Sequence, residues 1–507
     1  MTIRLETDVL VLGGGPAGTW AALSAAQAGA RVILADKAYC GTSGAAAASN
    51  NTIWYVPDER DHARHYRERG LLGGGLNEPG WVSAVLGMAV TQLHRLAQLG
   101  YPFPRSQDGS VNYASLRGPD YLRCMRHLIG RAGVSIMDHS PAASLMQDGD
   151  GAVTGAIGTT RQGAHWRVSA GATVIATGGC AFLSGALGTN VCTGDGHLAA
   201  AEAGATFSGM EFSCQYGIAP AFSSVTKGLP FHWASYYRAD GREVDTGDEE
   251  PFIAVARVLE QEAVYACFDR ADANIERWLR SGQANAFLPY DRLGIDPFRE
   301  RFAVALLHEG TVRGTGGILL RDRTCATTVP GLYAAGDAAS REPIVGGRSG
   351  GGSPNAAWAV TTGSWAGASA AQWALERHGA SPGDMPVPPA ALADPAHARC
   401  VIHSEVWPTQ KSLFRESSTM GASLQALDEA WHRPSPADVA VAQGRSARAM
   451  LLVARMANRS AQARRESRAL HRRLDYPDTL RHPRHVLVRG SSDLEVWHSP
   501  PLHAEAP

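Results

Sequence analysis

The chain has 507 residues and carries 47 Lys and Arg against 48 Asp and Glu, so its formal net charge is −1. This length predicts two or three domains, and the near-neutral charge gives no attraction for nucleic acid or an anionic membrane. Hydrophobic residues make up 44% of the chain, which excludes general disorder. No apolar run approaches the roughly 20 residues that span a bilayer, and the N-terminal segment lacks the layout of a signal peptide.

The first predicted element is a buried strand over residues 7–12, followed by an alanine-rich helix to about residue 29 and a second strand over 30–35. Gly13, Gly15 and Gly18 stand between strand and helix in the spacing G-x-G-x-x-G, which suits a tight turn, a close approach to a pyrophosphate and helix packing. The helix N-terminus favours phosphate, and Asp36 ends the second strand, where a carboxylate can hold ribose. With Pro16, Ala17 and Lys37 the motif looks like the FAD version; a tight turn without ligand is the alternative.

Glycine makes up 56 of the 507 residues, about 11% against a usual share of roughly 7%. The glycines form clusters that mark turns with close backbone approach, at 13–18, 41–44, 73–75, 178–179, 314–317 and 346–352. The eight cysteines are scattered and no two have C-x-x-C spacing, which argues against a metal or iron–sulfur site in this chain and fits the cytoplasm.

Later clusters repeat the pattern of a strand that runs into glycine. Residues 174–179 predict a strand, and Asp195 is placed to cap the helix that follows it. Residues 330–337 predict another strand, which ends at Asp337. The loop 346–352 leads into a helix from about Asn355, with Ser353 as N-cap and Pro354 at the first helical position. Such a helix start can stabilise a reduced flavin, although a glycine-rich surface loop is the alternative.

The expected cofactor contacts are therefore Gly13, Gly15, Pro16, Ala17, Gly18, Asp36, Lys37, Thr42, Ser43, Gly44, Ser49, Asn50, Ala176, Thr177, Gly178, Asn190, Thr193, Asp195, Gly336, Asp337, Gly352, Ser353 and Asn355.

Together these motifs resemble the flavoprotein subunits of the succinate dehydrogenase/fumarate reductase family. Three further segments carry the resemblance: Thr193-Gly194-Asp195-Gly196-His197, Met210-Glu211-Phe212 and a C-terminal signature over residues 465–477. The resemblance implies an α/β fold: a Rossmann-like doubly wound FAD-binding domain, an inserted α+β capping domain and a C-terminal helical domain. It also implies hydride transfer between substrate and flavin N5.

Departures from the family pattern narrow the function. The stretch 42–51 lacks the family's histidine for covalent attachment, so we expect non-covalent FAD; it looks more like adenylylsulfate reductase alpha subunits. The family's Q-F-H-P reads Gln215-Tyr216-Gly217, and its H-x-x-C-G-G reads 312–317 without histidine. Its arginine in R-D-x-x-x-R falls at Phe252, with Arg257 keeping the second position. We therefore do not expect standard C4-dicarboxylate chemistry.

The predicted boundaries follow these motifs. Residues 1–205 form the first FAD-binding segment, 206–312 the capping domain, and 313–378 the second FAD-binding segment. A Pro-rich linker over 381–389 precedes the helical domain at 390–480. The tail, 481–507, is expected to be partly disordered.

Five residues are candidates for the chemistry. Arg313 and Arg348 are candidate anchors for a carboxylate or sulfonate, with a salt bridge between domains as the alternative. His232, His308 and Tyr216 are candidate proton carriers, although with 18 histidines most must be surface or core residues. The arginines of 464–473 are read as structural, pairing with Glu466 and Asp475.

Three functions follow from this sequence. The first is an FAD enzyme that transfers hydride to or from a small polar metabolite. The second is a flavoprotein subunit like adenylylsulfate reductase alpha, which exchanges electrons with a ferredoxin-like iron–sulfur partner or another electron carrier. The third, which the sequence favours least, is an FAD-binding scaffold without activity. Association into a homo-oligomer stays open.

Overall fold

The computed structural model describes residues 2–48, 50–105, 108–226, 228–247, 250–349, 351–377 and 391–502. Ser49 and the predicted linker at 381–389 lie outside these residues. Within the described part, no helix combines the length and the apolar character needed to cross a membrane. All eight cysteines are free, and six of them are buried.

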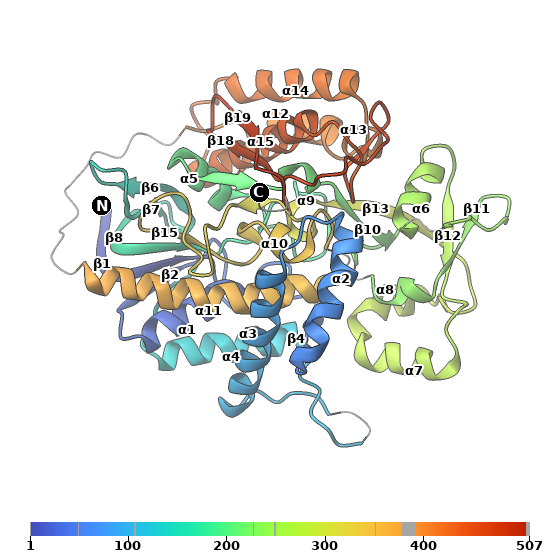
Figure 1. Cartoon of the computed structure of the whole chain (residues 1–507), viewed down its shortest axis with the longest axis horizontal. Coiled ribbons are helices and arrows are strands. Elements are labelled where there is room, and N and C mark those ends of the chain that lie inside the picture. The colour runs from blue at the N-terminus through green and yellow to red at the C-terminus, as the bar shows by residue number, and fades with distance from the viewer. Residues whose placement is uncertain are drawn as a thin grey trace.

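A seven-stranded sheet forms the centre of the molecule (Figure 1), with the order β5-β2-β1-β8-β7-β6 and with β15 paired to β8. Its parallel strands are β1 (Thr2–Leu12), β2 (Val32–Ala35), β5 (Ser135–Met137), β8 (His165–Ile175) and β15 (Leu332–Ala334). The antiparallel strands β7 (Val153–Thr159) and β6 (Ala142–Gln147) extend one edge. The predicted strand 7–12 is the buried half of β1; residues 2–6 are exposed but continue the pairing with β8.

Helices cover the sheet on both sides. In Figure 1, α1 (Pro16–Gln27), α4 (Gly118–Arg131) and α11 (Gly352–Glu376) lie below the sheet, while α12 (Pro395–Glu405), α14 (Ser417–His432) and α15 (Val441–Ala463) lie above it. α2 (His62–Gly73) and α3 (Pro79–Gln98) stand beside α11. The doubly wound α/β fold is thereby confirmed.

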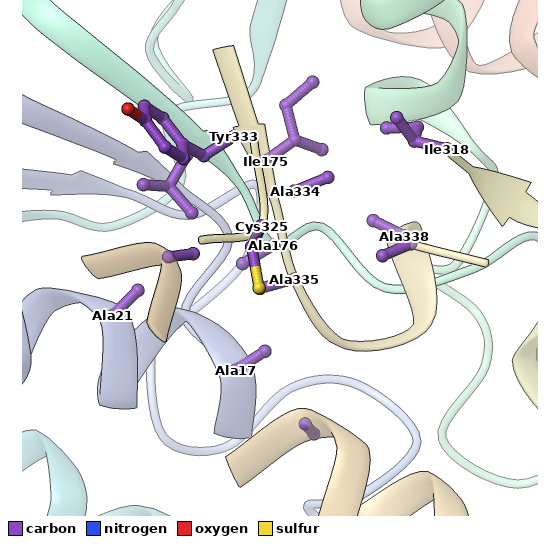
Figure 2. Packing of buried hydrophobic residues seen from close by; sticks show 14 of the residues in the cluster. Ala17, Ala21, Ile175, Ala176, Ile318, Cys325, Tyr333, Ala334, Ala335 and Ala338 are labelled. Atoms are coloured by element: carbon purple, nitrogen blue, oxygen red, sulfur yellow. The ribbon is translucent and has the colours of Figure 1, made fainter. Parts of the chain in front are cut away.

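Small side chains let α1 approach β8 and β15 closely. Figure 2 shows Ala17 and Ala21 of α1 beneath Ala334 and Ala335, the segment that ends β15. On the other side of α1, a Cβ added at Gly363 of α11 would lie 2.4 Å from the carbonyl oxygen of Ala17. A larger residue at these positions would push the helices away from the sheet and move the turn at the start of α1.

A second sheet with the order β10-β13-β12-β11 belongs to the cap. Its strands β10 (Gln215–Pro220), β11 (Ser235–Arg238), β12 (Val264–Cys267) and β13 (Phe302–Glu309) are antiparallel. The helices of the cap are α6 (Pro251–Leu259), α7 (Ala273–Gly282) and α8 (Ala284–Leu293). Phe268 packs edge-to-face on Phe231 and Phe302 in an apolar core distinct from that of the FAD-binding domain.

Part of the predicted tail forms strands. β18 (Val486–Arg489) and β19 (Glu495–His498) form a hairpin. β18 pairs with β9 (Thr206–Ser208), and β9 pairs with β14 (Gly317–Ile318). Backbone hydrogen bonds to strands far away in the sequence therefore hold this segment, which local sequence patterns do not identify as a strand.

Short elements complete the chain: β3 (Asn50–Thr52), β4 (Ser115–Arg117), β16 (Phe414–Arg415), β17 (Arg472–Arg473), α5 (Asp195–Glu202), α9 (Gly310–Arg313), α10 (Glu342–Val345), α13 (Thr409–Ser412), and the 3-10 turns η1 (Glu59–Asp61), η2 (Met210–Phe212), η3 (Pro230–Trp233) and η4 (Gly336–Ala338).

Candidate active site

A cavity of about 520 Å³ runs from the glycine turn after β1 to the cap. Its lining at the cofactor end includes Gly13, Gly15, Pro16, Ala17, Asp36, Lys37, Ser43, Gly44, Asn50, Ala176, Thr177, Gly178, Asp195, Gly336, Asp337, Gly352, Ser353 and Asn355. The structure thus brings most of the predicted cofactor residues together around one space. Of the others, Thr42 and Asn190 are exposed, whereas Gly18 and Thr193 lie behind the lining.

The glycine turn is shaped by backbone sterics. Gly13 has φ +105°, and a Cβ there would lie 2.3 Å from the carbonyl oxygen of Ala176, so only glycine fits. A Cβ at Gly18 would lie 1.8 Å from the carbonyl oxygen of Gly13, which explains the tight join of α1 to the turn. Gly15 faces open space within the cavity. The turn therefore holds the N-terminus of α1 toward the cavity, as a phosphate site requires.

Asp36 and Lys37 brace this end of the cavity. The Asp36 carboxylate accepts hydrogen bonds from the backbone N–H groups of Gly14, at 2.5 Å, and Ala38, at 2.6 Å. The Lys37 ammonium lies 2.7 Å from an Asp195 carboxylate oxygen and 2.6 Å from the Thr193 hydroxyl. Asp195 is the first residue of α5 and does not cap it; Gly194 is the N-cap. The predicted capping role of Asp195 is therefore wrong, because its carboxylate is turned to Lys37.

The start of α11 forms the other wall. This helix begins at Gly352 with Gly351 as N-cap, two residues before the position predicted from Ser353 and Pro354. Asp337, in η4, accepts a hydrogen bond of 2.6 Å from the buried guanidinium of Arg341. The backbone of this segment is fixed from behind, because Arg341 also donates to the carbonyl oxygen of Thr311.

The cavity fits FAD by two independent features. A Cβ at Gly15, Gly44 or Gly352 would meet no atom within 4 Å, so glycine keeps space open on three sides of the lining. The Thr177 hydroxyl and the Asn355 side-chain oxygen also line the cavity, and both are buried without a hydrogen-bond partner among the described residues. Unsatisfied polar atoms of this kind are rare in folded proteins and favour a ligand that completes their hydrogen bonds.

At the cap end, the predicted proton carriers differ in position. The Tyr216 hydroxyl donates to the carbonyl oxygen of Trp407 at 2.8 Å, and burial raises its pKa. His308 packs edge-on against Tyr216 at 4.7 Å and lies outside the cavity lining; its Nδ1 accepts the N–H of Gly310. Burial, reinforced by Arg415, lowers the pKa of His308 to about 3. His232, on η3, lines the cavity and is exposed.

Both predicted anchors line the cavity. Arg313 ends α9; its Nε is buried without a hydrogen-bond partner among the described residues and lies 3.9 Å from a Glu309 carboxylate oxygen. Arg348 forms an ion pair with Glu250. Burial, together with the neighbouring guanidiniums of Arg472 and Arg69, lowers the pKa of Arg348 to about 10.

Sequence reasoning missed several residues of the cap end. Glu250 precedes α6 and its Pro251, in the acidic run 248–250, which was the available signal. Other missed residues at this end are Thr226, Leu229, Phe231, Tyr236 and Gln283, whereas Phe252, which also lines it, had been placed at the family's arginine position. Arg257, by contrast, is exposed and lies over the ring of Phe414, outside the cavity lining. Among the described residues, no cluster of three His, Cys, Asp or Glu side chains could hold a metal ion.

Comparisons with known proteins agree with an FAD site at the cofactor end of the cavity. Residues 8–216 match the FAD binding domain family. An L-aspartate oxidase from Streptomyces coelicolor is 26% identical over 544 residues, covering 96% of this chain and 92% of that protein. One from Halobacterium salinarum is 32% identical over 236 residues, covering 42% of this chain and 45% of that protein.

Solved structures share the fold over the whole length. A quinol fumarate reductase chain from E. coli has a TM-score of 0.81 and 22% identity, covering 100% of this chain and 98% of that one. Adenylylsulfate reductase from Archaeoglobus fulgidus has a TM-score of 0.79 and 18% identity, covering 99% and 97%.

The fold, the FAD-binding domain and the cavity together define an FAD-dependent oxidoreductase. Within that class, the chain is similar in sequence to L-aspartate oxidases and in fold to the flavoprotein of quinol fumarate reductase, in line with the predicted resemblance.

Proposed function

We propose that this enzyme transfers hydride between non-covalently bound FAD and a small polar metabolite that carries a carboxylate or sulfonate. The observation that carries the proposal is the continuous cavity, with a phosphate turn at one end and Arg313 and Arg348 at the other. When bound, FAD takes up two electrons and a hydrogen at N5. Arg313 orients the anionic group of the substrate, and the cap excludes water from the space between them.

We further propose that C4-dicarboxylates are not the standard substrates. Two positive anchors and a proton donor are needed for such molecules. In this chain the family's two histidines are replaced at Gly217 and Val312, and Phe252 falls at the arginine position. The relatives from Streptomyces coelicolor and Halobacterium salinarum are L-aspartate oxidases. L-Aspartate is therefore the most informative compound to test against this proposal.

The test is a screen for anaerobic bleaching of the bound flavin. We expect yellow protein that releases FAD on acid treatment and is bleached by anionic metabolites outside the C4-dicarboxylates. In the Arg313→Gln variant, the substrate concentration needed for half-maximal bleaching should rise at least about tenfold, since a hydrogen bond to a charged group contributes about 1.5–3 kcal/mol. Arg257→Gln, at a cap arginine outside the cavity lining, is the matched control. Bleaching by succinate or L-aspartate above all other compounds would contradict the proposal.

A second candidate is a flavoprotein subunit that exchanges electrons with an iron–sulfur partner. The flavin loop over 42–51 and the whole-length likeness to adenylylsulfate reductase favour it. Co-purification of a small brown iron–sulfur protein would support this candidate. Rapid reoxidation of the reduced flavin by oxygen alone would count against it.

We propose the cytoplasm as the site of the reaction, because all eight thiols are free, as in a reducing compartment.

A further inference from the structure

The cap end of the cavity has an unusual charge balance for an anion-binding site. Arg313, Arg348 and Glu250 are its charged side chains among the described residues, and Glu250 is paired with Arg348. Asp36, Lys37, Asp195 and Asp337 also line the cavity, but they belong to the cofactor end. The charged side chains that line this end therefore sum to +1; Glu309, whose carboxylate lies 3.9 Å from Arg313 Nε, lies outside the lining. One anionic group is matched by this charge, whereas a second would remain without a counter-ion.

A patch of apolar side chains also lines this end, beside the polar side chains of Gln215, Thr226, His232 and Gln283. Phe252 is the second residue of α6, Phe231 lies on η3, and Ile218 lies on β10; each is less than 10% exposed. The ring of Phe231 packs at 5.3 Å against Phe268 of the cap core. The apolar lining is thus a continuation of that core and has little freedom to turn away from a ligand.

A buried hydroxyl belongs to the same apolar cluster as these side chains. The Tyr236 hydroxyl is buried and has no hydrogen-bond partner among the described residues, and Tyr236 lines the cavity. Thr226, which also lines the cavity, differs, because its hydroxyl donates to a Glu309 carboxylate at 2.8 Å. A hydroxyl or carbonyl group of the substrate would give the Tyr236 hydroxyl a hydrogen-bond partner. Without one, the buried hydroxyl reduces the stability of the fold.

We propose that the substrate of this enzyme is a monocarboxylate, or an equivalent monoanion, with an apolar body of ring size. This inference rests on the proposed function. Arg313 binds the anionic group, and Phe231, Phe252 and Ile218 pack against the body. A dicarboxylate would place its second charge against the aromatic lining without a counter-ion, and desolvation of that charge would oppose binding.

The test measures binding rather than turnover. Acetate, phenylacetate, cyclohexanecarboxylate, succinate and L-aspartate are titrated into the FAD-loaded enzyme at constant ionic strength, with the visible difference spectrum of the flavin and thermal stabilisation as readouts. We expect phenylacetate and cyclohexanecarboxylate to bind at least tenfold more tightly than succinate, L-aspartate or acetate. Equal or tighter binding of the dicarboxylates would overturn the proposal.

Two variants separate the apolar contact from general damage to the cap. Phe252→Ala should weaken phenylacetate about tenfold and leave acetate within twofold. Phe252→Arg should reverse the binding preference, so that succinate binds more tightly than phenylacetate. Circular dichroism and FAD content show whether this variant folds. If it does not fold, the Phe252→Ala result alone tests the apolar contact. Phe287→Leu, in the cap core outside the cavity lining, is the control. If Phe252→Ala weakened acetate and phenylacetate equally, the apolar contact would be excluded.

The outcomes also separate this inference from the proposed function. If apolar monocarboxylates bind tightly but no anionic metabolite bleaches the flavin, the inference about the substrate's shape is supported and the proposed hydride transfer is contradicted. Bleaching by small polar acids, with no preference for an apolar body, removes the inference and leaves the proposed function.

Discussion

The two ends of the cavity are built in different ways. The cofactor end is formed by backbone at strand ends and helix starts, with glycines that leave space open at Gly15, Gly44 and Gly352. The cap end is formed by side chains from β10, η3, β11, α6 and α9. A backbone site depends on positions at which no side chain is tolerated, so it is sensitive to any added group. A side-chain site can change its ligand by single substitutions while the fold stays the same.

The largest expected effect is at the cofactor end. Gly15→Asp adds a carboxylate at the start of α1, in open space and with ordinary backbone dihedrals. Two like charges about 4 Å apart near a protein surface repel by about 4 kcal/mol, so FAD affinity should fall roughly a thousandfold. The measurement is FAD content and a titration of apoprotein; Gly80→Asp, an open position in the first turn of α3 and outside the cavity lining, is the control. Retention of FAD by Gly15→Asp would place the pyrophosphate elsewhere.

The second effect concerns His308, which lies behind the cap end. Its pKa is lowered by burial to about 3, so the folded state keeps it neutral while the unfolded chain binds a proton below about pH 6.5. Stability is therefore lost as the pH falls from 6.5 toward 3, by roughly 2 kcal/mol for this residue at pH 5. His308→Gln should reduce this loss by that amount in urea unfolding.

The exposed His127 supplies the control, as His127→Gln. If His308 instead carried protons for substrate, His308→Gln would change the pH profile of flavin bleaching, which we expect to be unaltered.

A smaller effect is expected at the Arg348–Glu250 pair. Glu250→Gln removes the counter-ion and raises the net charge of the cap end from about +1 to about +2. Succinate should bind about tenfold more tightly, since a charge interaction of about 1.4 kcal/mol gives that factor. Flavin difference titrations measure it, with Glu262→Gln, at a cap ion pair with Arg238, as control. Unchanged succinate affinity would show that Arg348 does not face the substrate.

The smallest effect tests Asn50, where the two ends meet. Its side-chain amide donates to the carbonyl oxygen of Gly282, at the end of α7, and so joins the flavin loop to the cap. Asn50→Ala should lower the substrate affinity about fivefold, as the loss of a hydrogen bond of about 1 kcal/mol implies. FAD affinity should stay within twofold. In Asn51→Ala, whose amide donates to Ala46 inside the loop, FAD affinity should fall instead. The opposite pattern would make Asn50 a cofactor residue.

The sequence allowed the cofactor end to be predicted because its requirements are local. Gly13, Gly15 and Gly18 stand at fixed spacings between a strand and a helix, and the physical reasons for glycine can be read at each position. The start of α11 was predicted two residues late, because the N-cap is Gly351, where φ is +143° and no side chain marks the helix end.

The cap end could not be predicted in the same way. Glu250 and Phe252 contribute to the site only through the packing of α6 on the cap sheet, and nothing in their local sequence shows what they face. The strand β18 likewise pairs with β9, far earlier in the chain, so local patterns do not show this pairing.

The pairing of β15 with β8 and of β18 with β9 has a consequence for how the protein is made. A ribosome delivers β1, α1 and β2 long before β15 and α11, which complete the walls around the same turn. During that interval the nascent chain exposes a sheet edge and apolar helix faces, the surfaces on which aggregation begins. Capture of the cofactor must wait until translation has passed the start of α11, and the hairpin near the C-terminus closes last.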